Sequence, residues 1–168
     1  MPISDHLRAL RAKIGHDLLV MPAVTAIVYD DEGRVLLVKH SNRGVWVAPG
    51  GAVDPDERPV DAVVREVWEE TGLLVAPVAL CGVFGGPEFH VHYENGDAVS
   101  YVMAVYECRR LGGTLAADGV ETLDARYFAP GELAALDLSR WARVTLPHIL
   151  AHRGETWIPA VEWKPPAG

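Results

Sequence analysis

The pattern of apolar and polar positions predicts a chain of mixed helices and strands. Apolar residues recur at helical spacing in three segments, and short β-branched runs between glycine- and proline-containing turns are typical of strands. The predicted helices cover 3–15, 59–71 and 141–152, and the predicted strands cover 18–29, 34–39, 74–85, 89–93, 98–108 and 122–128. Strands before and after a central helix, with a further helix at the end, indicate an α+β fold.

Turn residues and breakers set the expected connections between these elements. Residues 30–33 read Asp-Asp-Glu-Gly, a typical turn sequence, so the first two strands are expected to pair as a hairpin. Asn95-Gly96 predicts a second hairpin between the strands at 89–93 and 98–108. Pro22 is a candidate break in the first strand. The charged, glycine-containing segment 109–113 is expected to form a turn.

The two ends of the chain carry apolar residues outside the predicted domain. We divide the chain into an N-terminal helix (1–17), a domain (18–152) and a C-terminal tail (153–168). The tail holds Trp157 and Trp163, and large aromatic side chains are usually buried, so part of it is expected to pack on the domain or on a second subunit. With the N-terminal stripe of Leu7, Leu10 and Ile14, this surplus of apolar surface predicts a homodimer.

Composition narrows the class of protein. The chain has 168 residues, of which 49% are apolar and 23% are charged, as in a single globular domain. Its formal charge of −8 and the absence of a basic run argue against binding nucleic acid through the phosphate backbone. Neither a signal peptide nor a membrane-spanning run is apparent, and the spacing of Cys81 and Cys108 fits no metal site. We therefore expect a cytoplasmic protein without a membrane or nucleic-acid partner.

The helix predicted over 59–71 carries the strongest chemical signal. Its apolar residues recur at i, i+3, i+4 and i+7 on one face: Val60, Val63, Val64 and Val67. At the helical repeat, Glu66, Glu69 and Glu70 fall within roughly 100° on another face. Each like-charge pair at this spacing costs an isolated helix about 0.2–0.5 kcal/mol. A solvated acidic face would account for two glutamates, but three converging carboxylates suit a hard divalent cation, which prefers oxygen ligands.

The segment around this helix resembles the signature of the Nudix hydrolases. Its residues read Gly51-x5-Glu57-x7-Arg65-Glu66-Val67-x-Glu69-Glu70-x-Gly72-Leu73, with every fixed position of the family pattern present. The resemblance implies an α/β/α sandwich with a mixed sheet between helices, and hydrolysis of a diphosphate bond with Mg²⁺ or Mn²⁺. It also implies metal ligands and a supporting arginine: Glu57, Glu66, Glu69, Glu70, the Gly50 carbonyl and Arg65. One departure is Arg58, which stands where a capping residue is usual, so that Asp56 or water has to cap the helix.

The base that activates water and the substrate contacts are less defined. Box glutamates Glu66 and Glu69 are candidates for the base, and Glu121 resembles the later-loop acid of some family members; Glu88, Glu94 and Asp97 are the competing loop acids. Candidate substrate contacts are Lys39, His40, Arg43, Phe89, Tyr93 and Tyr101, although each also fits a solvated or core position. The family's substrates are nucleoside diphosphates linked to varied groups, and Pro87 faintly favours the ADP-ribose or nucleotide-sugar type. The alternative is a Nudix-like binding or regulatory module without catalysis, against which the intact box argues.

Overall fold

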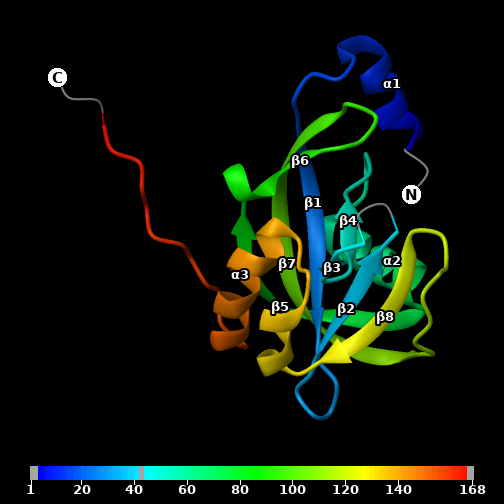
Figure 1. Ribbon diagram of the computed structural model, residues 1–168, viewed down its shortest axis with the longest axis vertical. Coiled ribbons are helices and arrows are strands. Elements are labelled where there is room, and N and C mark those ends of the chain that lie inside the picture. Colours follow the sequence, from blue (N-terminus) through cyan, green and yellow to red (C-terminus); the bar gives the residue numbers. More distant parts are fainter. Residues whose placement is uncertain (1–3, 42–43, 166–168) are drawn as a thin grey trace.

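The computed structural model describes residues 4–41 and 44–165, in which helices flank two sheets (Figure 1). The helices are α1 (Asp5–Ile14), α2 (Pro59–Thr71) and α3 (Arg140–Ala151), with short 3-10 helices η1 (Pro87–Phe89) and η2 (Pro130–Ala135). The strands are β1 (Leu19–Val28), β2 (Val35–His40), β3 (Trp46–Val47), β4 (Gly50–Ala52), β5 (Leu73–Phe84), β6 (His90–His92), β7 (Ala98–Gly113) and β8 (Thr122–Phe128). The predicted helices and the α+β class are confirmed.

The two sheets differ from the predicted hairpin order. One sheet has the order β4-β1-β7-β5, with β6 also paired to β7, and the other has the order β3-β2-β8. The turn at 30–33 is present, but the first two strands meet only at the bridge between Tyr29 and Val35. Beyond it, β2 pairs with β8 and β3 instead of β1. The prediction of a hairpin between β1 and β2 is therefore wrong, because the turn feeds β2 into the other sheet.

Strand β1 runs through Pro22 without a break. Its parallel ladder with β7 covers Leu19 to Val28 and includes Pro22 opposite Val102. The carbonyl of Pro22 accepts a hydrogen bond from the Val53 N–H, so this residue's backbone groups face the β4 side. The ladder with β4 begins only at Ala23. The missing proline N–H therefore costs no bond to β7, and the strand continues.

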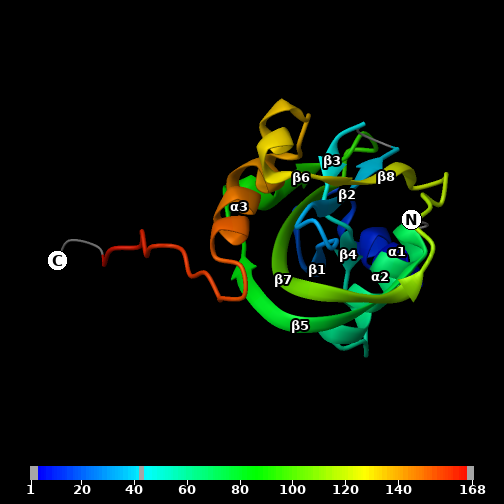
Figure 2. The same cartoon turned by 90° about the horizontal axis from the view of Figure 1, so that it is seen from below.

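Helices α2 and α3 cover opposite sides of the strands, so the chain has two apolar clusters (Figure 2). Alternate side chains of β1 point to opposite faces, and Val24 and Val28 join Val63 and Val67 of α2 in one cluster. Ile27 lies in the other cluster, with residues of α3. Both faces of β1 are thus covered from Ala23 to Val28, which accounts for the almost entirely apolar sequence of this half of the strand.

The predicted turn over 109–113 is also wrong, because β7 continues through this segment. Its residues pair antiparallel with the start of β5, where Arg109 lies opposite Ala76 and Gly113 opposite Leu73. Arg109 and Arg110 are exposed, so strand pairing places no charge in the core.

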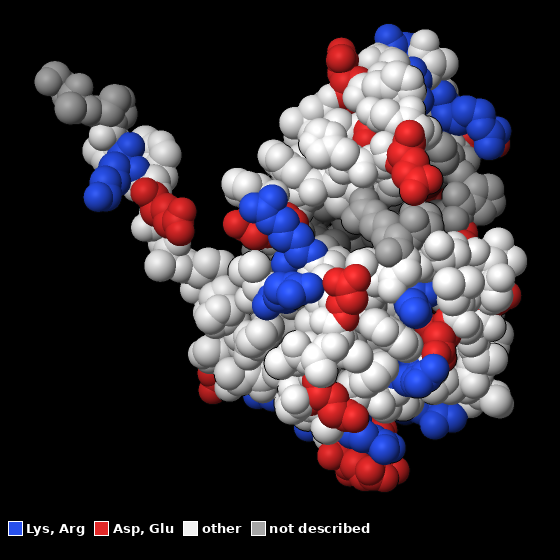
Figure 3. Space-filling view, viewed as in Figure 1, with Lys and Arg blue, Asp and Glu red and all other residues white. Residues whose placement is uncertain are grey.

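Over residues 153–165, the C-terminal tail contacts the domain only at its beginning. The Trp157 N–H donates to the Cys81 carbonyl at 2.8 Å, and the Trp157 ring packs on Phe84 and stacks on His148. Beyond this point the tail runs away from the domain (Figure 1), and Trp163 is 74% exposed. Among the residues described, no helix is long and apolar enough to cross a membrane. On the face in Figure 3, acidic and basic side chains are interspersed.

Candidate active site

Helix α2 presents two of its glutamates to the interior. It starts after Arg58, which contributes no side-chain cap and instead pairs with Asp61, and it ends at Gly72 in the left-handed conformation. Glu66 is 0% exposed and Glu70 is 2% exposed, so neither belongs to a solvated face. The side chain of Glu69, by contrast, is about half exposed. The three glutamates share one sector of the helix, but only two of them are buried.

The glycine turn before the helix allows these two carboxylates to approach the backbone closely. The Gly50 N–H donates a hydrogen bond of 3.0 Å to Oε2 of Glu70. A Cβ atom at position 51 would lie only 2.5 Å from Cδ of Glu66. At position 50 it would lie 2.2 Å from the carbonyl oxygen of Val24 in β1. At position 50 a side chain would collide with the backbone of β1, so the fold requires glycine there, whereas at position 51 it would displace only the carboxylate of Glu66.

Arg65 connects the remaining acidic residues to the turn. Its guanidinium donates to both carboxylate oxygens of Glu57 at 2.8 and 2.9 Å, and to Oε1 of Glu66 at 2.8 Å. Further bonds reach Oε2 of Glu69 at 3.3 Å and the Ala52 carbonyl at 3.1 Å. The arginine therefore holds Glu57 and Glu66 in fixed positions and anchors them to β4.

Burial and ion pairing move the pKa values of these groups in opposite directions. Burial raises the pKa of Glu66 to about 7, although the hydrogen bond from Arg65 opposes the shift. Burial also raises the pKa of Glu70 well above its usual range, against the hydrogen bond from Gly50. The hydrogen bond from Arg65 lowers the pKa of Glu57. For Glu66 and Glu70 the effect of burial on the pKa therefore outweighs that of the hydrogen bonds, whereas for Glu57 the hydrogen bond from Arg65 outweighs burial.

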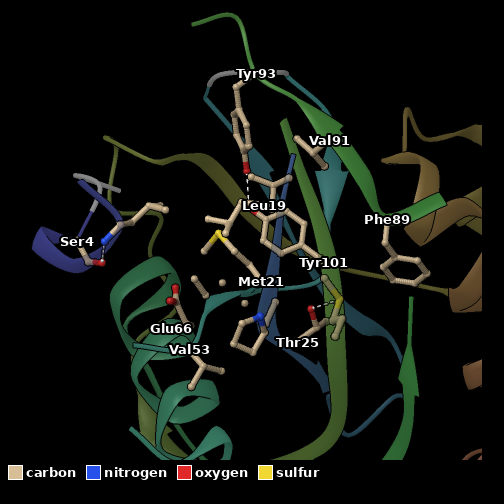
Figure 4. Close-up of a pocket in the computed structure, with 18 of the residues that line it drawn as sticks. Ser4, Leu19, Met21, Thr25, Val53, Glu66, Phe89, Val91, Tyr93 and Tyr101 are labelled. Atoms are coloured by element: carbon tan, nitrogen blue, oxygen red, sulfur yellow. Dashed lines mark hydrogen bonds between the residues drawn. The ribbon is translucent and has the colours of Figure 1, made fainter. Parts of the chain in front are cut away.

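Glu66 and Glu70 line one end of a cavity of about 930 Å³ (Figure 4). The same end includes Glu121 and His40, whose Nε2 lies 3.8 Å from Oε1 of Glu70. The cavity extends from there to the start of β1, to β6 and to α1. Among the described residues that line it, Arg11 is the only lysine or arginine.

The loop before β8 places Glu121 near the buried glutamates. The Asp118 carboxylate accepts hydrogen bonds from the backbone N–H groups of Val120, Glu121 and Thr122, which fixes the loop. The Thr122 hydroxyl, which is fully buried, lies 3.0 Å from the Glu70 carbonyl oxygen and ties this loop to the end of α2. The charge of Glu121 contributes to raising the pKa of both Glu66 and Glu70, as expected for a neighbouring carboxylate.

Only some of the predicted substrate contacts and metal ligands line the cavity. Tyr93 lines the cavity, with its hydroxyl 2.6 Å from that of Tyr101. Phe89 borders the cavity but is 4% exposed and stacks on Trp141. Lys39 lies opposite Asp124 of β8 and is not among the lining residues, and neither are Glu57 and Glu69. Arg43 lies outside the described residues.

The positions of the α2 carboxylates show whether they could bind the divalent cation that the sequence predicts. Within residues 4–41 and 44–165, no three histidine, cysteine or acidic side chains are gathered into a metal-binding group. However, Oε2 of Glu66 is buried and forms no hydrogen bond with any described residue. A buried carboxylate oxygen without a donor is energetically costly, and a cation would satisfy it. The arrangement of Glu66 and Glu70 therefore fits an oxygen-ligand cation, with Glu69 directed to solvent beside Arg65.

Sequence reasoning missed two groups of residues around the cavity. Thr122 lies in a predicted strand to which the sequence gives no role, and only the fold places it against the Glu70 carbonyl. The sequence predicts Leu7 and Leu10 in a dimer interface, whereas both line the cavity in the structure. Their apolar stripe was visible in the sequence, but it did not indicate which surface the stripe would face.

Comparison with known proteins agrees with this geometry. The family model described as NUDIX domain matches residues 19–149, and the chain belongs to this family. It is 33% identical over 150 residues to a MutT-like protein of Streptomyces ambofaciens, covering 82% of this chain and 87% of the relative. It is 37% identical over 109 residues to a putative 8-oxo-dGTP diphosphatase of Bacillus subtilis, covering 64% and 65%.

A solved structure extends the likeness to the fold. The crystal structure of an ADP-ribose pyrophosphatase from Streptococcus suis superposes with a TM-score of 0.63 at 29% identity, covering 82% of this chain and 96% of that one. The predicted Nudix-type sandwich, with its mixed sheet between helices, is thereby confirmed. The family match and the named relatives place this protein in the class of Nudix pyrophosphohydrolases.

Proposed function

We propose that this protein hydrolyses a diphosphate bond in a nucleoside diphosphate derivative and requires a divalent metal ion, Mg²⁺ or Mn²⁺. The observation that carries the proposal is the pair of buried glutamates at one end of a large cavity, one of them with an unpartnered oxygen. A cavity of this size is in the range that holds a nucleotide-sized ligand. The relatives named for 8-oxo-dGTP and ADP-ribose support a nucleotide substrate, with the ADP-ribose or nucleotide-sugar type favoured.

The charge balance of the cavity supports the need for a metal. Glu66, Glu70 and Glu121 line the same end, and Arg65, which donates to Glu66, is shared with Glu57 and Glu69. An anionic diphosphate would be repelled by these carboxylates without a cation. Glu66 and Glu70 would hold the cation, and Glu57, Glu69 and the Gly50 carbonyl remain the further ligands that the family resemblance implies. A bound divalent cation neutralises phosphate oxygens and acidifies a water molecule.

The side chains of this protein would then position the reaction. Water attacks one phosphorus, the bridging P–O bond breaks, and the proton of the water passes to a carboxylate. Glu121 lines the cavity together with Glu66 and Glu70 and is the loop acid that we propose as this base, with Glu66 and Glu69 as the alternatives. Arg65 contacts neither water nor substrate in this scheme, and its role is to fix the carboxylates of Glu57 and Glu66.

Conservative variants distinguish metal ligands from a base. Glu70→Gln keeps the shape of the side chain but removes a charge from the metal site, so turnover should require much more magnesium. Glu121→Gln should leave the magnesium dependence unchanged and lower turnover by about 10²–10⁴-fold, the usual cost of losing a general base. Turnover measured against magnesium concentration separates the two effects. Parent-like turnover of Glu121→Gln at saturating magnesium would exclude Glu121, and the base would then be a box glutamate, Glu66 or Glu69, or another loop acid.

We also propose a homodimer. Support comes from the end of the tail, where Ile158, Val161 and Trp163 are 80%, 86% and 74% exposed. Such a run of exposed apolar residues is typical of a surface that another chain covers. Light scattering at micromolar concentration tests this: a mass near 18.3 kDa would mean a monomer.

A further inference from the structure

The N-terminal helix α1 is placed over the cavity and outside the family match. The family model begins at residue 19, whereas α1 covers Asp5–Ile14. None of the residues of α1 is fully buried, so the helix adds little to the core. Its half-buried Leu7 and Leu10 line the cavity instead. This helix therefore forms a wall of the cavity and contributes no fully buried residue to the core.

A compact network fixes α1 in this position. The side chain of Arg11 is only 10% exposed, and its guanidinium donates to the carbonyls of Gly15, Asp17 and Ala98. Its Nε lies 3.5 Å from Oδ2 of Asp97, and Nδ1 of His16 lies 2.8 Å from Oδ1 of the same carboxylate. Asp97 belongs to the turn between β6 and β7, so the network links α1 to that hairpin.

The wall opposite α1 is apolar and aromatic. Leu19 and Met21 of β1 and Val99 and Tyr101 of β7 line this part of the cavity, with Tyr93 beside them (Figure 4). The hydroxyls of Tyr93 and Tyr101 bond to each other. The donors of Arg11, the only lysine or arginine among the described lining residues, are directed to backbone carbonyls and Asp97. Such a surface suits an uncharged planar group and disfavours a second phosphate.

We propose that α1 and the aromatic wall form the site for the base of the nucleotide, and that α1 is the element of this chain that selects it. The inference rests on the proposed function, since the cavity joins this site to Glu66 and Glu70. The apolar side chains of α1 cover one face of the base, and the tyrosines together with Leu19 and Met21 of β1 provide the opposite surface. The diphosphate then extends toward the buried glutamates.

Equilibrium binding of reaction products tests this without hydrolysis. The probes are AMP, GMP, CMP and UMP, compared with ribose 5-phosphate, which carries the same phosphate and sugar but no base. We expect calorimetry on the full chain with saturating magnesium to give at least one nucleotide an affinity about tenfold or more above that of ribose 5-phosphate. If ribose 5-phosphate binds as tightly as every nucleotide, the inference is overturned.

Matched variants on α1 assign the preference to this helix. Leu10→Glu places a carboxylate in the base site and should abolish the preference for nucleotides while leaving the affinity for ribose 5-phosphate unchanged. Ala9→Glu makes the same change at an exposed neighbouring position and should keep the preference. Leu10→Ala retains helix propensity and should also reduce the preference for nucleotides over ribose 5-phosphate. It replaces Leu10→Glu in the test if that variant does not fold. An unchanged preference in the Leu10 variants, or an equal loss in Ala9→Glu, would overturn the inference.

The binding test of the base site and the hydrolysis test of the proposed function can fail independently of each other. A parent protein that prefers nucleotides but hydrolyses none of them supports the base site and removes the hydrolase proposal. A parent protein that hydrolyses nucleotides but binds ribose 5-phosphate as tightly as the nucleotides supports the hydrolase proposal and removes the base site.

Discussion

Replacing Gly51 by alanine tests whether the position of the Glu66 carboxylate sets the activity. A Cβ at position 51 would lie 2.5 Å from Cδ and Oε1 of Glu66 and 2.6 Å from Oε2. Non-bonded heavy atoms pack at about 3.5–4.0 Å, so the carboxylate has to retreat by roughly 1 Å. Misplacing a catalytic group by about 1 Å can cost 10²-fold in rate, and we expect kcat/KM to fall by about that factor.

The same substitution should leave the fold nearly intact. The atoms in the way belong to a side chain, and Gly51 is not among the residues with positive φ. Alanine also restricts the unfolded chain, so the free energy of unfolding should change by less than about 1 kcal/mol.

Steady-state kinetics at saturating magnesium and urea denaturation measure the two effects of Gly51→Ala. Gly112→Ala is the matched control, because a Cβ at 112 meets no atom within 4 Å, and both quantities should stay parent-like. Gly50→Ala is the opposite control, since its Cβ would collide with the backbone of Val24 and Thr25, and it should lose the fold. Parent-like kcat/KM in folded Gly51→Ala would refute the dependence of activity on the Glu66 position.

Three further outcomes follow from buried contacts. Thr122→Val removes the hydroxyl beside the Glu70 carbonyl, so the free energy of unfolding in urea should fall by about 1–3 kcal/mol; an unchanged midpoint would contradict this. Trp157→Ala should lower the melting temperature because it removes about 1–2 kcal/mol of packing, whereas the exposed Trp163 can be replaced by alanine without this loss. Equal melting temperatures of the two variants would show that Trp157 does not stabilise the domain. The hydrogen bond from His16 lowers the pKa of Asp97, so its stabilisation is complete above the ordinary pKa of about 4 and is lost as pH falls below it. Melting curves should therefore separate the parent from Asp97→Asn at neutral pH and converge in acid, and a gap that persists in acid would count against this assignment.

Local patterns predicted the elements better than their partners. The strand at 122–128 has the predicted bounds, and α2 covers 59–71 as its apolar spacing indicates. The sheet that a strand joins depends on packing between distant segments, so the turn at 30–33 did not reveal that β2 pairs with β8. The direction of a backbone group is equally invisible in sequence, which is why Pro22 was read as a break.

The site shows the same limit. The spacing of Glu66, Glu69 and Glu70 placed them in one sector of the helix, but the position of the sheet decided which were buried. The glycine turn predicted a close approach, and the carboxylates of Glu66 and Glu70 lie against it. The place of α1 over the cavity could not be predicted, because an apolar stripe carries no information about what it faces.

Phosphate release, after phosphatase treatment, tests whether a divalent cation at the buried glutamates enables this protein to hydrolyse a diphosphate bond in a nucleotide derivative. The substrates are ADP-ribose, nucleotide sugars, dinucleoside polyphosphates and nucleoside triphosphates, each with magnesium and with a chelator. We expect release that depends on magnesium for at least one of these compounds, while circular dichroism of the chelated protein keeps its helical signal. If the folded, magnesium-loaded protein releases phosphate from none of them, it is not a metal-dependent hydrolase of these nucleotide derivatives.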